Sequence, residues 1–566
     1  MNKERKDLIS YFSMEIGFDS TIPTYSGGLG VLAGDTLKSC ADLCIPTVAI
    51  TLLHRQGYFD QKMDSANYQV ELPVAWDPLS KLEPLDIEVE LIIDSKPVKI
   101  RAWKYDLKGQ TGFSVPIYFL DTWVEGNSHF NKMINKKLYD SNPQFRISQE
   151  MILGIGGVKM LRALGYSKEE IKIYHMNEGH ASFLTLELLK EFNYNKEEVK
   201  KRCVLTTHTP VPAGHDVFDY GIAKKIMGDS LPDNIGELST RENLHTTILA
   251  LNLSSYANAV SKKHQQVTQR MFPFHKIENV TNGVHSLTWT SESFRNLFDE
   301  YLPGWSLNPV LLKKSGNIPK EKVWEAHMEA KSYLLELVNG YHGVNMQEDI
   351  LTIGYARRIT SYKRATLIFN DLVRLAQIAK GKIQLVFAGK AHPDDQPGKM
   401  IIRELMRNQE IFRDRIQIAY LQNYNMDLAR LIISGVDVWL NTPVRPREAS
   451  GTSGMKALLN GGLNFSTLDG WWIEGYQMDD LAGWEIGPEP TEDYMVEIDP
   501  AIDADSLYDR LGTEIIPLYY NSRENWIERM QHAISLGSYF NTHRMVEEYA
   551  KNAWHIDIPN LKSTMA

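Results

Sequence analysis

The chain has 566 residues, which is enough for several ordinary domains or for two large lobes. Hydrophobic residues make up 43% of it and charged residues 23%, a composition typical of a globular enzyme. The formal net charge is −10 and no long block carries one sign, so a surface for nucleic acid or for an anionic membrane is not expected.

Cysteine usage and hydropathy indicate the cellular setting. Three cysteines, at positions 40, 44 and 203, are too few for a disulfide scaffold. The charged start is not followed by the apolar segment of a signal peptide, and no run approaches the roughly 18–20 apolar residues that cross a bilayer. We therefore expect a cytoplasmic protein with reduced thiols and no membrane partner.

The first predicted unit joins a strand, a glycine loop and a helix. Residues 8–13 are an apolar strand, Gly27 and Gly28 follow in a glycine loop, and a helix then extends to about residue 43. In a βαβ unit this places the glycines where a phosphate can meet a helix N-terminus. A tight turn is the alternative for so short a pattern.

Alternating residues between 69 and 120 predict an antiparallel sheet inserted into the first lobe. Later strands end in polar residues that include His180 and Asn282, at the position where open α/β sheets bind ligands. His208 and His215 have no acidic or further histidine partner at ligand spacing, so no metal site is predicted.

The second half repeats the alternation of strands and helices. After a helical stretch, strands are predicted at 349–355, 383–388, 416–420 and 436–440, which indicates a parallel sheet with right-handed crossovers. The predicted fold class is therefore α/β, with two Rossmann-like lobes and a cleft between them. We expect the lobes to span residues 1–290 and 291–530.

Four cations follow the strand at 349–355 within eight positions: Arg357, Arg358, Lys363 and Arg364. Arginine suits bidentate phosphate recognition, while lysine acts as a point charge. The grouping favours an anion site at the end of the strand. A solvated surface patch is the alternative.

A loop of small residues follows the strand at 436–440. Glu448 opens this loop, and Lys456 lies just inside the helix that closes it. The loop leaves backbone N–H groups free to bind a phosphate or a sugar hydroxyl. A free amine at position 456 can bind an aldehyde cofactor, whereas an ordinary solvated lysine is the other interpretation.

The stretch Glu448–Gly462 and the segment Arg-Ile-x-x-Tyr-Lys-Arg from Arg358 resemble signatures of the glycogen (α-glucan) phosphorylases of the short prokaryotic type. The resemblance covers about residues 8–554. It implies the GT-B fold, with C-terminal helices in 531–566 that cross back to the first lobe. It also implies pyridoxal 5′-phosphate on Lys456.

The activity that the resemblance implies is retaining phosphorolysis of an α-1,4-glucan. The non-reducing end of glycogen or maltodextrin would react with inorganic phosphate to give α-D-glucose 1-phosphate. The cofactor phosphate would support protonation of the glycosidic oxygen by the substrate phosphate, so no second carboxylate of the glycosidase kind is needed. Nearby phosphates repel each other by several kcal/mol, which the grouped cations would offset.

The family motifs assign roles to matching residues. The catalytic residues implied are Lys456, Arg358 and Lys363. The cofactor-binding residues implied are Lys456, Gly28, Arg357 and Thr452. The substrate-binding residues implied are Gly27, His180, Asn282, Arg358, Lys363, Glu448, Ala449, Ser450 and Gly451.

Two other functions remain open. Nucleotide-sugar glucan synthases of the same fold share the glycine loop and Glu448, but many carry a second glutamate eight positions later, where this chain has Lys456. A non-catalytic glucan-binding relative could use Trp471 and Trp472 as a platform, although such a pair is more typical of a core. Control through an N-terminal regulatory region is not expected, and the subunit count, a homodimer included, stays open.

Overall fold

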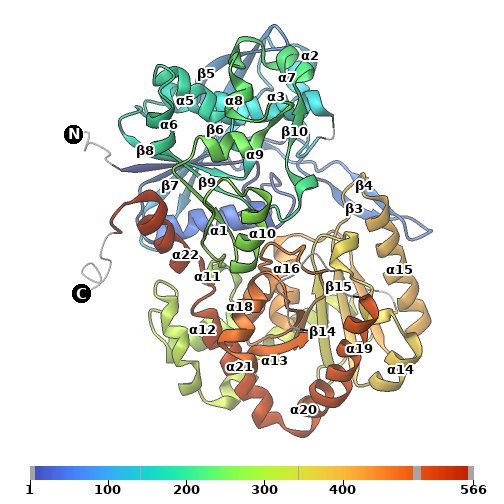
Figure 1. Ribbon diagram of the computed structural model, residues 1–566. Helices are drawn as coiled ribbons and strands as arrows, with labels where there is room; N and C mark the ends of the chain where they lie inside the picture. The colour runs from blue at the N-terminus through green and yellow to red at the C-terminus, as the bar shows by residue number, and fades with distance from the viewer. Residues whose placement is uncertain (1–6, 141, 342, 489–498, 559–566) are drawn as a thin grey trace.

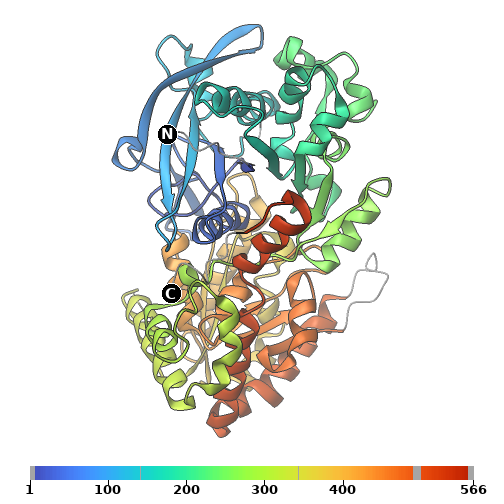
Figure 2. The same ribbon diagram turned by 90° about the vertical axis from the view of Figure 1, so that its left-hand side faces the viewer.

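The computed structural model describes residues 7–140, 142–341, 343–488 and 499–558, and Figures 1 and 2 show it from two sides. Two large β-sheets form the core of the structure. None of the helices in these ranges is long and apolar enough to cross a membrane.

Nine strands form the first sheet, in the order β13-β12-β9-β8-β1-β2-β7-β6-β5. Their bounds are β1 (Leu8–Ser13), β2 (Thr47–Leu52), β5 (Glu83–Ile93), β6 (Lys96–Lys108), β7 (Ser114–Asp121), β8 (Ile171–Asn177), β9 (Cys203–Thr206), β12 (Tyr256–Ala259) and β13 (Glu278–Asn279). Only the pairings of β6 with β5 and β7 are antiparallel. Every residue of β1 and β2 is buried, because helices and loops cover both faces of the sheet there.

The segment between 69 and 120 differs in one respect from the prediction. Its strands are antiparallel, as expected, but they do not form a separate inserted sheet. β7 pairs in parallel with β2, so β5–β7 extend the main sheet at its edge. A separate hairpin, β3 (Asp60–Met63) and β4 (Gln69–Leu72), precedes them.

Six strands form the second sheet, all parallel, in the order β16-β15-β14-β17-β18-β19. Their bounds are β14 (Leu351–Ala356), β15 (Ile383–Ala388), β16 (Gln417–Leu421), β17 (Val438–Asn441), β18 (Leu463–Thr467) and β19 (Gly483–Ile486). The predicted α/β class with two sheets of this kind is confirmed. The four strands predicted in this half all exist, with ends displaced by at most two residues.

Helices cover the faces of both sheets (Figure 1). Those up to residue 301 are α1 (Gly28–Asp42), α2 (His129–Met133), α3 (Pro143–Met151), α4 (Gly157–Ala163), α5 (Leu184–Glu191), α6 (Lys196–Arg202), α7 (Tyr220–Met227), α8 (Ile235–Leu238), α9 (Thr246–Asn252), α10 (Lys262–Met271), α11 (Ser286–Trp289) and α12 (Glu292–Tyr301). The others are α13 (Lys320–Asn339), α14 (Leu372–Ala379), α15 (Gln396–Phe412), α16 (Met426–Gly435), α17 (Ser453–Leu458), α18 (Trp471–Met478), α19 (Pro500–Arg510), α20 (Ile516–Asn521), α21 (Arg523–Gly537) and α22 (Thr542–Tyr549).

The C-terminal segment returns to the first sheet, where the red α22 packs against the blue α1 (Figures 1 and 2). The backbone N–H of Val284 donates to the carbonyl of Phe540 at 3.2 Å, and that of Thr542 donates to the carbonyl of Val284 at 3.0 Å. Further on, the indole of Trp554 donates to Nδ1 of His175, a residue of β8, at 3.1 Å. The last helix is therefore anchored on the opposite lobe.

Among the described residues, buried apolar side chains form three cores, which follow the division of the chain into two sheets. Two lie on the faces of the nine-stranded sheet, and the third surrounds the six-stranded sheet. Val284 and Trp289 already belong to the third core. We propose a boundary between the lobes in this region, close to the predicted residue 290.

Candidate active site

A cavity of about 380 Å³ lies between the lobes, at the carboxyl ends of strands from both sheets. The start of α1, the ends of β9 and β14, and the loop after β17 all contribute to its wall. Parallel strands gather their carboxyl ends at one edge of a sheet, so residues far apart in sequence meet there.

Hydrogen bonds to Glu15 hold the glycine loop at the start of α1. The carboxylate Oε2 accepts the N–H of Ser26 at 2.5 Å, and Oε1 accepts the hydroxyl of Tyr139 at 2.7 Å. A Cβ on Gly30 would lie 2.7 Å from Glu15 Oε2, which explains the glycine there. A Cβ on Gly27 or Gly28 would meet only open space, so the helix start is accessible to a ligand.

Lys456 lies buried in the wall of the cavity. Its Nζ is 3.6 Å from the centroid of the Trp289 ring, whose indole N–H donates to Oδ2 of Asp35 at 2.7 Å. Burial lowers the pKa of Lys456 to about 8 against the attraction of the Asp35 carboxylate. A substantial neutral fraction near pH 8 makes this amine able to attack a carbonyl carbon.

The predicted cations reach the cavity in different ways. Arg357 is buried and donates to Asn441 Oδ1 and, at 3.0 Å, to Ser453 Oγ. Arg358 is exposed along the wall. Lys363 forms an ion pair with Glu448, and although burial alone would lower its pKa, the Glu448 carboxylate raises it above the ordinary value. Lys363 is therefore fully charged at neutral pH.

The loop that begins at Glu448 is held by buried polar contacts. Asp469 accepts the N–H of Glu448 and that of Gly470, each at 2.9 Å. Ser261, which comes from the other lobe, donates its hydroxyl to the carbonyl of Ala449 at 2.6 Å. Gly451 has a φ of +72°, a conformation that favours glycine. These contacts fix the loop while its residues face the cavity.

The structure brings together every predicted site residue except His180. The lining residues are Gly27, Gly28, Asn282, Arg357, Arg358, Lys363, Glu448, Ala449, Ser450, Gly451, Thr452 and Lys456. His180 lies instead in the turn after β8, with Nε2 3.3 Å from Asp216 Oδ2 and its ring against Tyr139. Among the described residues it does not line this cavity.

Other lining residues were missed. His208, at the end of β9, lines the cavity and its Nε2 lies 2.7 Å from Asn177 Oδ1. Its place directly after a strand is the same signal for ligand binding that marks His180. Tyr362 lies inside the segment that starts at Arg358, whereas Tyr58 and Tyr424 come from two other loops that no local pattern marks as neighbours.

The residues present fit an anionic aldehyde such as pyridoxal 5′-phosphate. Lys456 offers an amine of lowered pKa, and Gly27 and Gly28 leave room beside a helix start. Nε of Arg357 and Oδ1 of Asn282 are buried without a hydrogen-bond partner among the described residues. Such atoms are costly unless a ligand or water satisfies them.

Comparison with known proteins identifies the family. The family model for carbohydrate phosphorylases matches residues 223–480. The chain is 40% identical to a maltodextrin phosphorylase of Thermococcus litoralis, over 96% of this chain and 70% of that protein. It is 36% identical to a glycogen phosphorylase of Aquifex aeolicus (96% and 85%) and 32% identical to an uncharacterized protein of Methanocaldococcus jannaschii (96% and 99%). The chain belongs to the carbohydrate phosphorylase family.

Proposed function

We propose that this enzyme is an α-1,4-glucan phosphorylase, which splits the non-reducing end of an α-glucan with inorganic phosphate to give α-D-glucose 1-phosphate. The observation that carries the proposal is that one cavity holds the buried Lys456 amine together with Arg358 and Lys363. Membership of the phosphorylase family and the names of the relatives support the same reaction.

Pyridoxal 5′-phosphate is the cofactor that we assign to Lys456. Gly28, Arg357 and Thr452 would surround it, since all three line the cavity together with that lysine. When bound, the cofactor supplies a phosphate group that acts as an acid–base partner of the substrate phosphate. Arg357 would place positive charge close to it, and its buried Nε, which has no hydrogen-bond partner among the described residues, could donate to the phosphate.

Lys363 and Arg358 would bind inorganic phosphate. In the structure Glu448 neutralises Lys363, so an incoming phosphate has to compete with this carboxylate. Loss of the ion pair would free Glu448 to accept a hydroxyl of the glucosyl unit. Phosphate binding and sugar binding would thus be coupled through the Lys363–Glu448 pair.

The glucosyl unit would bind against the loop after β17. The N–H groups of Ala449, Ser450 and Gly451 would donate to its hydroxyls from this side. Asn282, whose Oδ1 has no hydrogen-bond partner among the described residues, would bind it from the other lobe. The predicted contact from His180 remains a proposal. A closed, polar wall on both sides would orient the anomeric carbon toward the bound phosphate and exclude water.

The synthase alternative gains no support from this site. Its discriminating feature is a second acid eight residues after Glu448, which would bind two ribose hydroxyls. The buried Lys456 occupies that position here, and its Nζ packs on the Trp289 ring. A homodimer remains a prediction.

The test is phosphate-dependent release of glucose 1-phosphate from maltodextrin by the purified chain. We expect activity in the native protein, its loss in Lys456→Ala, and no change in Lys314→Ala, a control at an exposed lysine of a distant turn. Transfer from a sugar nucleotide without phosphorolysis would contradict the proposal in favour of a synthase. Glucan binding with neither activity would favour a non-catalytic relative.

A further inference from the structure

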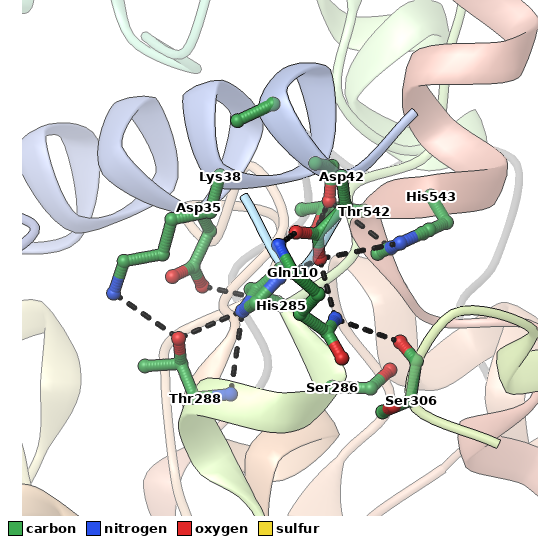
Figure 3. Close-up of polar contacts among 12 residues, drawn as sticks. Asp35, Lys38, Asp42, Gln110, His285, Ser286, Thr288, Ser306, Thr542 and His543 are labelled. Atoms are coloured by element: carbon green, nitrogen blue, oxygen red, sulfur yellow. Dashed lines mark hydrogen bonds and ion pairs between the residues drawn. The ribbon is translucent and has the colours of Figure 1, made fainter. Parts of the chain in front are cut away.

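Asp42, His285 and His543 meet where α22 crosses α1, outside the cavity described above (Figure 3). Nε2 of His285 lies 3.0 Å from Oδ2 of Asp42, and Nε2 of His543 lies 3.6 Å from the same oxygen. All three side chains are buried, and one potential ligand atom from each lies within 4.8 Å of the others. Among the described residues this is the one such group of three.

A second layer of polar groups orients each of the three side chains. Nδ1 of His285 lies 2.7 Å from Thr288 Oγ1, and Nδ1 of His543 lies 3.2 Å from Ser39 Oγ. Oδ1 of Asp42 accepts the backbone N–H of Gln110 at 2.7 Å. Histidines that bind a metal usually donate their other ring N–H to an oxygen in this way.

His543 carries the feature that a hydrogen-bond network alone does not explain. Its Nε2 is buried and has no hydrogen bond of normal length to the described residues. The unpartnered nitrogen points toward a carboxylate oxygen that already accepts His285 and Gln110.

We propose that Asp42, His285 and His543 bind a divalent transition metal, with Zn²⁺ as the ion that best suits two imidazoles and one carboxylate. Zn²⁺ lies about 2.0–2.2 Å from such ligands, so tetrahedral ligand atoms are roughly 3.3–3.5 Å apart. The separations of 3.0 and 3.6 Å from Asp42 Oδ2 bracket this value, and one potential ligand atom from each of the three residues lies within 4.8 Å of the others. Small movements of the side chains would therefore complete the site.

Metal binding would change the hydrogen bonds of His285. Its Nδ1 accepts the backbone N–H of Thr288 at 3.3 Å and lies 2.7 Å from Thr288 Oγ1. Binding through Nε2 would move the ring proton to Nδ1, with Thr288 Oγ1 as its acceptor in place of the contact with the backbone N–H. Gln110, whose amide covers Asp42, is exposed, so a movement of its side chain would admit water to a fourth position. The same residue provides a short entry path for the ion.

A metal at this position would have a structural role. It would join the end of α1, the turn before α11 and the helix α22, segments that are 243 or more residues apart in sequence. The returning C-terminal helix would then be held on the first lobe by ligand bonds as well as by packing. This inference does not rest on the proposed phosphorylase activity.

The first measurement is a titration of the chelator-treated, full-length protein with Zn²⁺ alone, followed by calorimetry and by metal analysis after gel filtration. We expect about one ion per chain and a rise in melting temperature that depends on the Zn²⁺ concentration. Mg²⁺ should produce neither effect, because it prefers oxygen ligands. A native chain that retains no Zn²⁺ would overturn the proposal.

Variants then assign the ion to this cluster. His543→Gln and Asp42→Asn should lose the Zn²⁺-dependent rise in melting temperature, while His264→Gln, a buried histidine elsewhere, should keep it. Ser39→Ala removes the hydroxyl that contacts His543 Nδ1 and Thr542 Oγ1 but leaves all three ligands in place. It should weaken Zn²⁺ binding by about 10–100-fold, which keeps the test decisive if the ligand variants do not fold. Equal Zn²⁺ affinity in the native chain and Ser39→Ala, or in His543→Gln, would contradict the assignment.

Discussion

Lys456 has the surroundings of a reactive amine. It packs on the Trp289 ring and is almost completely removed from water, which disfavours its charged form. Because its pKa is lowered from 10.5 to about 8, half of the amines are neutral at pH 8. An ordinary lysine at that pH is neutral in less than about 1% of molecules.

This shift predicts how the cofactor-free chain takes up pyridoxal 5′-phosphate. The neutral amine is the attacking form, so the rate of loading should rise about tenfold per pH unit below pH 8 and level off above it. The measurement is the absorbance of bound cofactor after rapid mixing, between pH 6 and pH 10. A rate that keeps rising to pH 10 would show that the amine titrates like an exposed lysine.

At the scale of elements, the start of α1 depends on the contact between Gly30 and Glu15. A methyl group at position 30 would collide with the carboxylate that accepts the N–H groups of Ser26 and Gly27. Gly30→Ala should therefore destabilise the chain by about 1–3 kcal/mol and weaken cofactor retention. Thermal unfolding and the cofactor content after dialysis measure the two effects.

The matched control is Gly316→Ala, because a Cβ there meets nothing within 4 Å. It should leave both the melting temperature and the cofactor content close to those of the native chain. If Gly30→Ala behaves like Gly316→Ala, Glu15 does not hold the glycine loop in the way described.

The sequence was most informative where periodicity and strand ends coincide. The strands at 351–356 and 383–388 have continuous apolar runs, and the cations and the small-residue loop follow directly after strands. Such local patterns were enough to predict the two-sheet fold, and together with the family resemblance they identified twelve residues of the cavity wall. The edge of the first sheet was harder, because alternation in 83–121 reveals antiparallel strands but not that β7 pairs with β2.

Contacts between distant segments could not be predicted in the same way. His180 follows a strand as His208 does, yet it turns toward Asp216, while His208 lines the cavity. The sequence pattern around the two histidines is the same, so only the packing of the folded chain distinguishes their positions. The same holds for Asp42, His285 and His543. They are far apart in the sequence, so no local pattern predicts that they lie close together in the folded chain.

At the scale of the whole molecule, the lobes are joined by the returning C-terminal helix. Trp554 is fully buried at its end, stacks on Tyr549 with 5.6 Å between ring centroids and bonds to His175 of β8. Trp554→Ala should destabilise the chain by about 3–5 kcal/mol, since it removes a large buried side chain. Differential scanning calorimetry should show a lowered first transition.

Phe274→Ala is the control for loss of an aromatic ring, because Phe274 is 96% exposed. It should leave the first transition unchanged. An equal effect of the two variants would mean that the C-terminal contact does not stabilise the lobes.

The central claim is that Lys456 carries an aldehyde cofactor next to the phosphate-binding cations. The most direct measurement is mass spectrometry of the active enzyme after borohydride reduction and digestion. We expect a reduced pyridoxal phosphate adduct on the peptide that contains Lys456, and loss of phosphorolysis on reduction or on removal of the cofactor. An unmodified peptide in an enzyme that retains activity with a sugar nucleotide donor would contradict the account.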